Sequence, residues 1–136
     1  MRDREDDLSE QNGRGGASLA GVRVLVVDDD ARVRMVLTVV LEADGASVTS
    51  VGSAAQALRV LPVERPDVLL TDLNMPEVDG FGLIQQVRAL PPEHGGQTPA
   101  ALITGLSDAL DRAKVLRAGF QFCQAPKRKL LLHLSQ

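Results

Sequence analysis

The stretch VRVLVVDDD, residues 22–30, joins a nearly continuous apolar run to three consecutive aspartates. A strand covered on both faces must be apolar at almost every position, which is how the strands of a parallel sheet read. Residues 22–27 therefore predict a central strand, and Asp28 and Asp29 stand where it should end. Because ligands of open α/β sheets bind at the carboxyl ends of the strands, a functional site is expected there.

A third aspartate follows another apolar run. Residues 68–71 (VLLT) predict a strand, and Asp72 comes directly after it. Three carboxylates at the ends of two strands repel one another strongly unless a cation or a proton offsets their charge. Hard divalent cations prefer carboxylate oxygens as ligands. Asp28, Asp29 and Asp72 therefore predict a cation site, whereas a lone acidic pair is usually only a solvated turn.

Outward from these strands, short β-branched runs alternate with longer segments of helical periodicity, the pattern of a parallel sheet with crossover helices. Asp30 and Ser53 are expected helix N-caps, Asp79 is an acidic residue at a helix start, and Pro62 is expected to end a helix. The predicted strands are residues 22–27, 46–51, 68–71, 100–104 and a weak 120–124; the predicted helices are about 31–44, 54–61, 81–90, 107–118 and one starting no earlier than 127.

Size and composition favour one soluble domain. The 136 residues leave no room for a second folded domain, and residues 1–20, charged and glycine-rich, predict a flexible leader. The net charge of −3 and the lack of a long basic stretch argue against direct nucleic-acid binding. Cys123 is the single cysteine, so no internal disulfide is expected, and no apolar run is long enough for a membrane span. We expect a cytoplasmic protein.

Three blocks of the chain, VRVLVVDDD, DVLLTDLNMPEVDG and PAALITGLSD, together resemble the response-regulator receiver domain of two-component signalling. The resemblance covers residues 21 to about 118, and the segment RALPPEHGGQTPAALITG is particularly similar to receivers of hybrid histidine kinases. It implies a receiver domain over residues 21–136, with a doubly wound five-stranded parallel α/β sheet in the flavodoxin-like order 2-1-3-4-5 and a shortened last helix.

The same resemblance implies roles for the acidic residues. Asp72 becomes the phosphoryl acceptor, Asp29 a direct Mg²⁺ ligand and Asp28 a ligand through water, and the backbone carbonyl of Asn74 completes the protein's share of the coordination. The chemistry independently favours this set, because Mg²⁺ takes oxygen ligands in an octahedron and keeps several waters. Asp72 would then attack phosphorus as a carboxylate nucleophile.

Residues in two loops receive supporting roles. The resemblance implies that Thr104 binds a phosphoryl oxygen, although a threonine at a strand end is otherwise ordinary. Gly105 leaves its N–H free to approach an anion. Met75, Pro76 and Gly80 are interpreted as shaping their loop, since proline fixes φ and glycine permits turns that other residues resist.

The stretch GFQFCQAPKRK departs from the family pattern, in which a Lys-Pro pair follows the fifth strand. Matching Pro126 puts Ala125 in the lysine position and keeps Phe122 as the aromatic switch residue. Matching the lysine selects Lys127 and puts Gln124 in place of the aromatic. Lys127 would supply a charge-assisted bond to the phosphoryl group, or belong to a solvated KRK cluster. The short tail KRKLLLHLSQ also fits poorly, and a truncated or frame-shifted end is one hypothesis.

Three function classes follow. The leading one is a single-domain response regulator that takes a phosphoryl group from a histidine kinase or histidine phosphotransfer protein onto Asp72 with Mg²⁺. It then switches a surface for a downstream protein, and it is no enzyme beyond self-catalysed phosphorylation and dephosphorylation. The alternative is a degenerate pseudo-receiver, a phosphorylation-independent interaction module, against which the intact acids argue. A Mg²⁺-dependent phosphohydrolase ranks last, because Asn74 stands where its second acid is expected.

Overall fold

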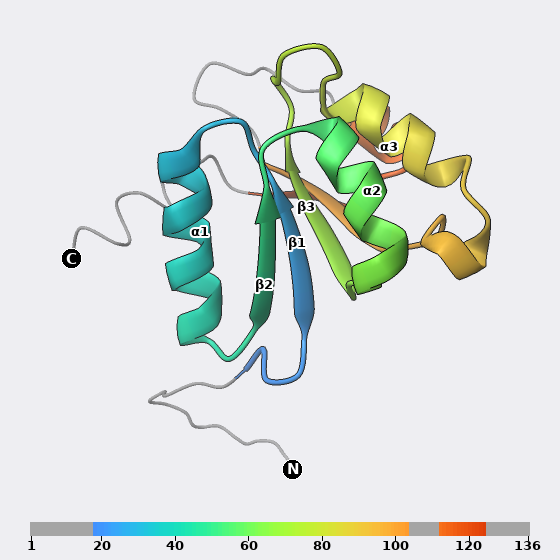
Figure 1. Ribbon diagram of the computed structural model, residues 1–136. Helices are drawn as coiled ribbons and strands as arrows, with labels where there is room; N and C mark the ends of the chain where they lie inside the picture. The colour runs from blue at the N-terminus through green and yellow to red at the C-terminus, as the bar shows by residue number, and fades with distance from the viewer. Residues whose placement is uncertain (1–17, 104–111, 125–136) are drawn as a thin grey trace.

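The structure, a computed structural model, describes residues 18–103 and 112–124. Strands and helices alternate along this part of the chain (Figure 1). The strands are β1 (Arg23–Val27), β2 (Ser47–Val51), β3 (Val68–Asp72), β4 (Ala100–Ile103) and β5 (Phe122–Gln124). The helices are α1 (Ala31–Ala43), α2 (Ala54–Glu64), α3 (Gly80–Arg88) and α4 (Arg112–Ala118), with a short 3₁₀ helix, η2 (Pro92–His94), before β4.

All strand pairs of the sheet are parallel, and β1 lies between β2 and β3. In this register Val24 of β1 is level with Val48 of β2 and Val68 of β3. The predicted doubly wound parallel sheet is confirmed for the order β2-β1-β3-β4. The three residues of β5 pair with β4 at the edge and continue that order.

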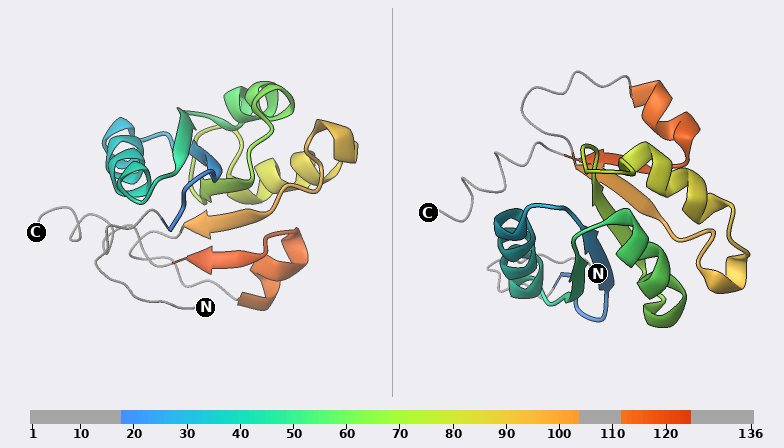
Figure 2. Two further views of the ribbon diagram at one scale, coloured as in Figure 1. Left: turned by 90° about the horizontal axis from the view of Figure 1, so that it is seen from below. Right: turned by 45° about the horizontal axis from the view of Figure 1, so that its top comes forward.

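Helices cover both faces of the sheet, and each face has its own hydrophobic core. Helix α1 lies on one face, and α2, α3 and α4 lie on the other (Figures 1 and 2). The alternation of side chains along each strand divides the residues between the two cores. The larger core, beneath α2 to α4, includes Leu25, Leu69, Leu83, Ile84 and Leu102, and the smaller core, beneath α1, includes Val24, Val26, Val33, Leu37 and Ile103.

The structure corrects the predicted end of α2, because the helix continues past Pro62 to Glu64. Proline removes one backbone donor and crowds the preceding turn. Here it lies in the last turn, so the helix ends soon afterwards at Glu64, and the next residue, Arg65, adopts the left-handed conformation with φ of 49°. Leu61, 1% exposed in the larger core, holds this turn against the sheet.

Arg88, at the end of α3, joins three segments that are distant in the sequence. Its guanidinium donates to the carbonyl oxygens of Thr98 and Gly119 at 2.7 Å and of Gly96 at 3.0 Å. It also donates to Oε1 of Gln121 at 3.2 Å, and this side chain accepts from the N–H of the first β4 residue. Burial lowers the pKa of Arg88 from its ordinary value. The side chain therefore fastens α3 to both ends of the segment that contains β4 and α4.

Several predicted segments extend beyond the described residues. Ser18 to Ala20 form a turn, and Leu19, inside the predicted leader, packs against the core beneath α1. Residues 1–17, the predicted helix start at 107–111 and the predicted last helix lie outside the described residues. Among the helices that the structure describes, none has both the length and the apolar character needed to cross a bilayer.

Candidate metal centre at the ends of β1 and β3

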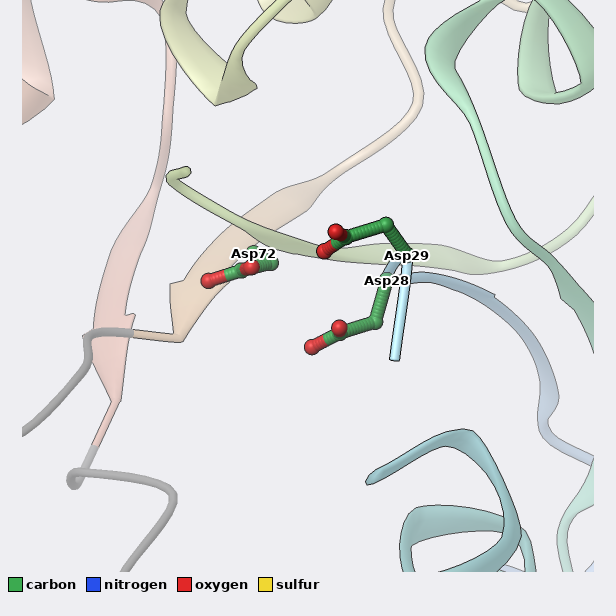
Figure 3. Close-up of side chains that lie close together, drawn as sticks. All are labelled: Asp28, Asp29 and Asp72. Atoms are coloured by element: carbon green, nitrogen blue, oxygen red, sulfur yellow. The ribbon is translucent and has the colours of Figure 1, made fainter. Parts of the chain in front are cut away.

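The three aspartates highlighted by the sequence lie together at one edge of the sheet. Asp28 and Asp29 follow β1, and Asp72 is the last residue of the adjacent β3. One carboxylate oxygen from each lies within 4.8 Å of the other two. Figure 3 shows the three side chains converging. Asp28 and Asp72 are only 2% and 4% exposed, whereas Asp29 is exposed to solvent.

The arrangement concentrates negative charge in a largely buried place. Two unit charges about 5 Å apart repel by roughly 3 kcal/mol at an effective dielectric constant of about 20. A bound divalent cation turns this repulsion into attraction, and the donor set consists of the oxygen ligands that Mg²⁺ prefers. The residues present therefore fit a magnesium ion, and the exposed Asp29 leaves the cluster open to solvent on its side.

The turn from β1 to α1 orients Asp28. The Asp28 N–H donates to the carbonyl oxygen of Val51 in β2 at 3.2 Å, so the turn remains attached to the sheet. Oδ1 of Asp28 accepts from the N–H of Asp30 at 2.9 Å. Asp30 in turn caps α1, as predicted, by accepting from the N–H of Arg32 at 2.9 Å. The helix start and the orientation of the carboxylate thus depend on the same turn.

The loop after β3 is packed tightly against Asp72. Leu73 and Met75 are buried in the larger core, and their side chains hold the loop against this core. The N–H of Gly80 donates to the carbonyl oxygen of Leu73 at 2.7 Å, and a Cβ on Gly80 would lie 2.6 Å from the carbonyl oxygen of Asp72. Gly80 shapes the loop, as predicted, but the reason is this close approach rather than an unusual turn conformation.

The rest of this loop contains a strained residue that the sequence did not reveal. Glu77 has φ of 71°, in the left-handed region that residues with a Cβ rarely adopt. Next to it, the N–H of Val78 donates to the carbonyl oxygen of Pro76 at 2.8 Å. Asp79 then caps α3 by accepting from the N–H of Gly82 at 2.8 Å. The predicted helix start at Asp79 is confirmed.

Two further residues support the site and were missed in the sequence. Nη1 of Arg34 donates to the carbonyl oxygen of Asp28 at 2.6 Å, from the first turns of α1. Thr71 is fully buried, and its hydroxyl donates to the carbonyl oxygen of Asp72 at 3.0 Å. A cation one turn into the helix that follows an acidic pair is a signal that could have identified Arg34.

Of the other predicted site residues, only Asn74 lies within the part of the chain that the structure describes. Asn74 is exposed two positions after the end of β3. Thr104, Gly105 and Lys127 lie outside the described residues. The backbone of Phe122 pairs with Ala101 of β4, and this pairing leaves both alignments of the lysine position open.

The parallel sheet has the strand order β2-β1-β3-β4, and the carboxylates lie at the adjacent ends of β1 and β3. These two features define a flavodoxin-like α/β domain with an acidic site. The family model described as the response regulator receiver domain matches residues 24–123. The chain therefore belongs to the response-regulator receiver family of two-component signalling. Receiver domains are phosphoryl acceptors rather than enzymes in the ordinary sense, and they interact with histidine kinases or phosphotransfer proteins.

Curated relatives include a short protein and longer regulators. An uncharacterised 14.6 kDa protein from the sodA1 3′ region of Leptolyngbya boryana is 45% identical over 103 residues, covering 76% of this chain and 77% of that protein. The DNA-binding response regulator MtrA of Mycolicibacterium paratuberculosis is 34% identical over 97 residues, covering 71% of this chain. The chain spans only 41% of MtrA, so the DNA-binding activity of the whole regulator is not carried over.

Solved structures of receivers from histidine kinases are also similar. The receiver domain of a sensor histidine kinase from Pseudomonas aeruginosa, with magnesium coordinated in its active-site cleft, is 30% identical with a TM-score of 0.68, covering 85% of this chain and 95% of that one. The receiver of the histidine kinase CKI1 from Arabidopsis thaliana, complexed with Mg²⁺ and BeF₃⁻, is 29% identical with a TM-score of 0.70, covering 82% and 84%.

Proposed function

We propose that this chain takes a phosphoryl group from a histidine kinase or histidine phosphotransfer protein onto Asp72 and, in response, switches a protein-interaction surface. The observation that carries the proposal is the convergence of the carboxylates of Asp28, Asp29 and Asp72 within 4.8 Å at the ends of β1 and β3. Membership of the receiver family, whose domains are phosphoryl acceptors, supports it.

Magnesium belongs to this proposal. Asp29 and Asp72 would hold Mg²⁺ directly, Asp28 would hold it through water, and the carbonyl of Asn74 would be a further ligand. When bound, the ion supplies positive charge that neutralises the acids and the incoming phosphoryl oxygens. The magnesium reported in the similar receiver from Pseudomonas aeruginosa supports this assignment.

The chain's own residues perform the transfer by holding one carboxylate in place. A carboxylate oxygen of Asp72 forms a bond to phosphorus while the phosphorus–nitrogen bond of a donor phosphohistidine breaks. The products are an acyl phosphate on Asp72 and the donor's imidazole, whose leaving nitrogen keeps the electron pair of the broken bond; a proton already on the other ring nitrogen, or one taken from solvent, makes this imidazole neutral. The close approach of Gly80 to the carbonyl oxygen of Asp72 fixes the backbone that carries this side chain, and the side chain is buried, so the carboxylate has little freedom to move, which favours reaction by orientation. Thr104, Gly105 and Lys127 are proposed to bind the phosphoryl oxygens.

The proposal extends to the remainder of the protein. A cytoplasmic location, a downstream protein target and self-catalysed loss of the phosphoryl group are parts of it. So are a complete five-stranded receiver with a shortened last helix and the leader predicted over residues 1–20, which must end before Leu19 because that residue packs against the core beneath α1. The pseudo-receiver is not favoured, because a module that no longer switches has no need of three acids close enough to repel one another.

The direct test measures phosphorylation by intact mass. The protein is incubated with Mg²⁺ and acetyl phosphate, and we expect an added mass of about 80 Da, that of one phosphoryl unit. Asp72→Asn should abolish the adduct. Asp79→Asn is the matched control, because Asp79 lies in the same loop but only caps α3, and asparagine caps equally well. An adduct that persists in a folded Asp72→Asn variant, or none with any donor, would contradict the proposal.

A further inference from the structure

Asp28 and Asp29 are neighbours in the chain, yet their side chains point the same way. Successive side chains of a strand point to opposite faces of the sheet. Strand β1 ends at Val27, and Figure 3 shows the carboxylates of both aspartates directed toward Asp72. The chain must therefore leave the strand geometry at the peptide that joins the two aspartates. The orientation of this peptide decides where both carboxylates lie.

A side chain from α1 holds this peptide. Its carbonyl group is that of Asp28, and the oxygen accepts from Nη1 of Arg34 at 2.6 Å. Because a peptide is planar, fixing the carbonyl oxygen also fixes the amide nitrogen of Asp29. The Asp28 N–H donates to the carbonyl oxygen of Val51, and Oδ1 accepts from the N–H of Asp30. Of these three bonds to Asp28, only the one from Arg34 comes from a side chain.

The loop after β2 leaves room for the guanidinium. A Cβ on Gly52 would lie 3.1 Å from Nη1 and 3.6 Å from Cζ of Arg34. Arg34 is partly buried, and it forms no ion pair within residues 18–103 and 112–124. Its charge-assisted bond is therefore made to a backbone carbonyl, which leaves the carboxylate oxygens of the aspartates available to a cation.

We propose that Arg34 is a positioning residue for the metal centre, which sets the mutual placement of Asp28 and Asp29 and so raises the affinity of the site for Mg²⁺. The proposal rests on the magnesium assignment of the proposed function. Arg34 acts through the peptide and not as a ligand, since a guanidinium has no acceptor atom for a cation. Groups that orient metal ligands typically contribute about 10- to 100-fold to metal affinity.

The charge of Arg34 has the opposite effect on Mg²⁺, so the two roles differ in sign. A fixed cation near the acidic cluster repels the ion, and removing that charge alone should tighten binding. Removing the group that orients two of the carboxylates should weaken binding. A merely structural role would lower the stability of the fold and leave the Mg²⁺ affinity of the folded chain unchanged.

Thermal unfolding of the whole chain, followed by circular dichroism over a range of MgCl₂ concentrations at constant ionic strength, tests the proposal. The rise in Tm above each variant's own metal-free value gives the dissociation constant, so basal stability does not enter. Arg34→Gln should raise the dissociation constant for Mg²⁺ about tenfold or more. Arg34→Lys keeps a charged donor and should recover only part of this loss, because an ammonium lacks the reach and the planar geometry of the guanidinium.

Arg32→Gln is the matched control. It removes the same charge from the same helix, but Arg32 is exposed, and its backbone N–H rather than its side chain is hydrogen-bonded in the described part of the chain. We expect this variant to bind Mg²⁺ like the native chain. Equal changes in Arg32→Gln and Arg34→Gln would assign the effect to net charge and overturn the proposal.

The rate at which acetyl phosphate forms the Asp72 adduct gives a second readout. Arg34→Gln should need more Mg²⁺ to reach half of its maximal rate, and its rate should return toward the native one at saturating Mg²⁺. Native or tighter Mg²⁺ binding in folded Arg34→Gln would overturn the inference and leave the proposed function intact, whereas a native chain that binds no Mg²⁺ would overturn both. If Arg34→Gln does not fold, native affinity in Arg34→Lys would overturn the inference.

Discussion

Replacing Gly80 by alanine probes how closely the loop after β3 is packed against the proposed acceptor. The added Cβ would lie 2.6 Å from the carbonyl oxygen of Asp72, 3.1 Å from Cα of Leu73 and 3.1 Å from Cδ1 of Leu102. Two of these atoms belong to the backbone, so no rotamer change can relieve the contact. Either the start of α3 or the end of β3 must shift, and a shift of β3 displaces Asp72.

The expected loss of stability follows from two opposing terms. Overpacking a well-packed site costs about 1–3 kcal/mol. Alanine is favoured over glycine by up to about 1 kcal/mol inside a helix, and by less at its first position, where Gly80 stands. The unfolding free energy should therefore fall by about 1–2 kcal/mol and Tm by roughly 5 °C. Because the chain contains no Trp or Tyr, urea and thermal unfolding are followed by circular dichroism.

Gly82→Ala is the matched control for this prediction. It adds the same atom to the same helix, but its close contact is Cγ1 of Val78 at 2.8 Å, a side-chain atom that can move. We expect its stability to equal or exceed that of the native chain, since residue 82 gains helix propensity. Equal losses in the two variants, or no loss in Gly80→Ala, would refute the packing argument. Gly80→Ala should also slow formation of the Asp72 adduct measured by mass spectrometry.

Three further predictions concern other parts of the structure. Mg²⁺ at 100 times its dissociation constant should stabilise the chain by about 2.7 kcal/mol in thermal unfolding, and Asp29→Asn should remove most of that gain. Arg88→Gln leaves the carbonyl oxygens of Gly96 and Gly119 without their donor and should lower the free energy of unfolding in urea by about 2–4 kcal/mol. Arg88→Lys should recover only part of this loss, and equal stability of the native chain and both variants would contradict the prediction. Asp79→Ala should lose about 1 kcal/mol of cap stabilisation that Asp79→Asn keeps.

Local patterns predicted much of the fold. The continuous apolar runs identified β1 and β3, because only doubly covered strands can be apolar at nearly every position. Asp30 and Ser53 were recognisable as caps, since a short polar side chain before an apolar-periodic segment has few other uses, and both accept from backbone N–H groups as predicted. The acids could be grouped from sequence because the ends of neighbouring parallel strands must lie together.

Features that depend on contacts distant in the sequence could not be predicted in this way. The continuation of α2 past Pro62 depends on burial of Leu61 against the sheet. The hydrogen bonds from Arg88 reach residues 8 to 33 positions away, and no pattern in the sequence near Arg88 predicts them. The left-handed conformation of Glu77 arises because the chain must return from β3 to α3 within one short loop. The lysine position has two competing alignments because the chain near Pro126 departs from the family pattern.

The central position of β1 has a consequence for biosynthesis. Its first partner, β2, begins at Ser47, and its second, β3, begins at Val68, so β1 leaves the ribosome well before either neighbour. Parallel neighbours cannot close through a short hairpin, and the intervening helix must be made first. An apolar strand with two unsatisfied edges is therefore exposed during translation, which is a condition that promotes aggregation. We expect newly made chains arrested before β3 to depend on chaperones and chains arrested after β4 to be largely independent of them.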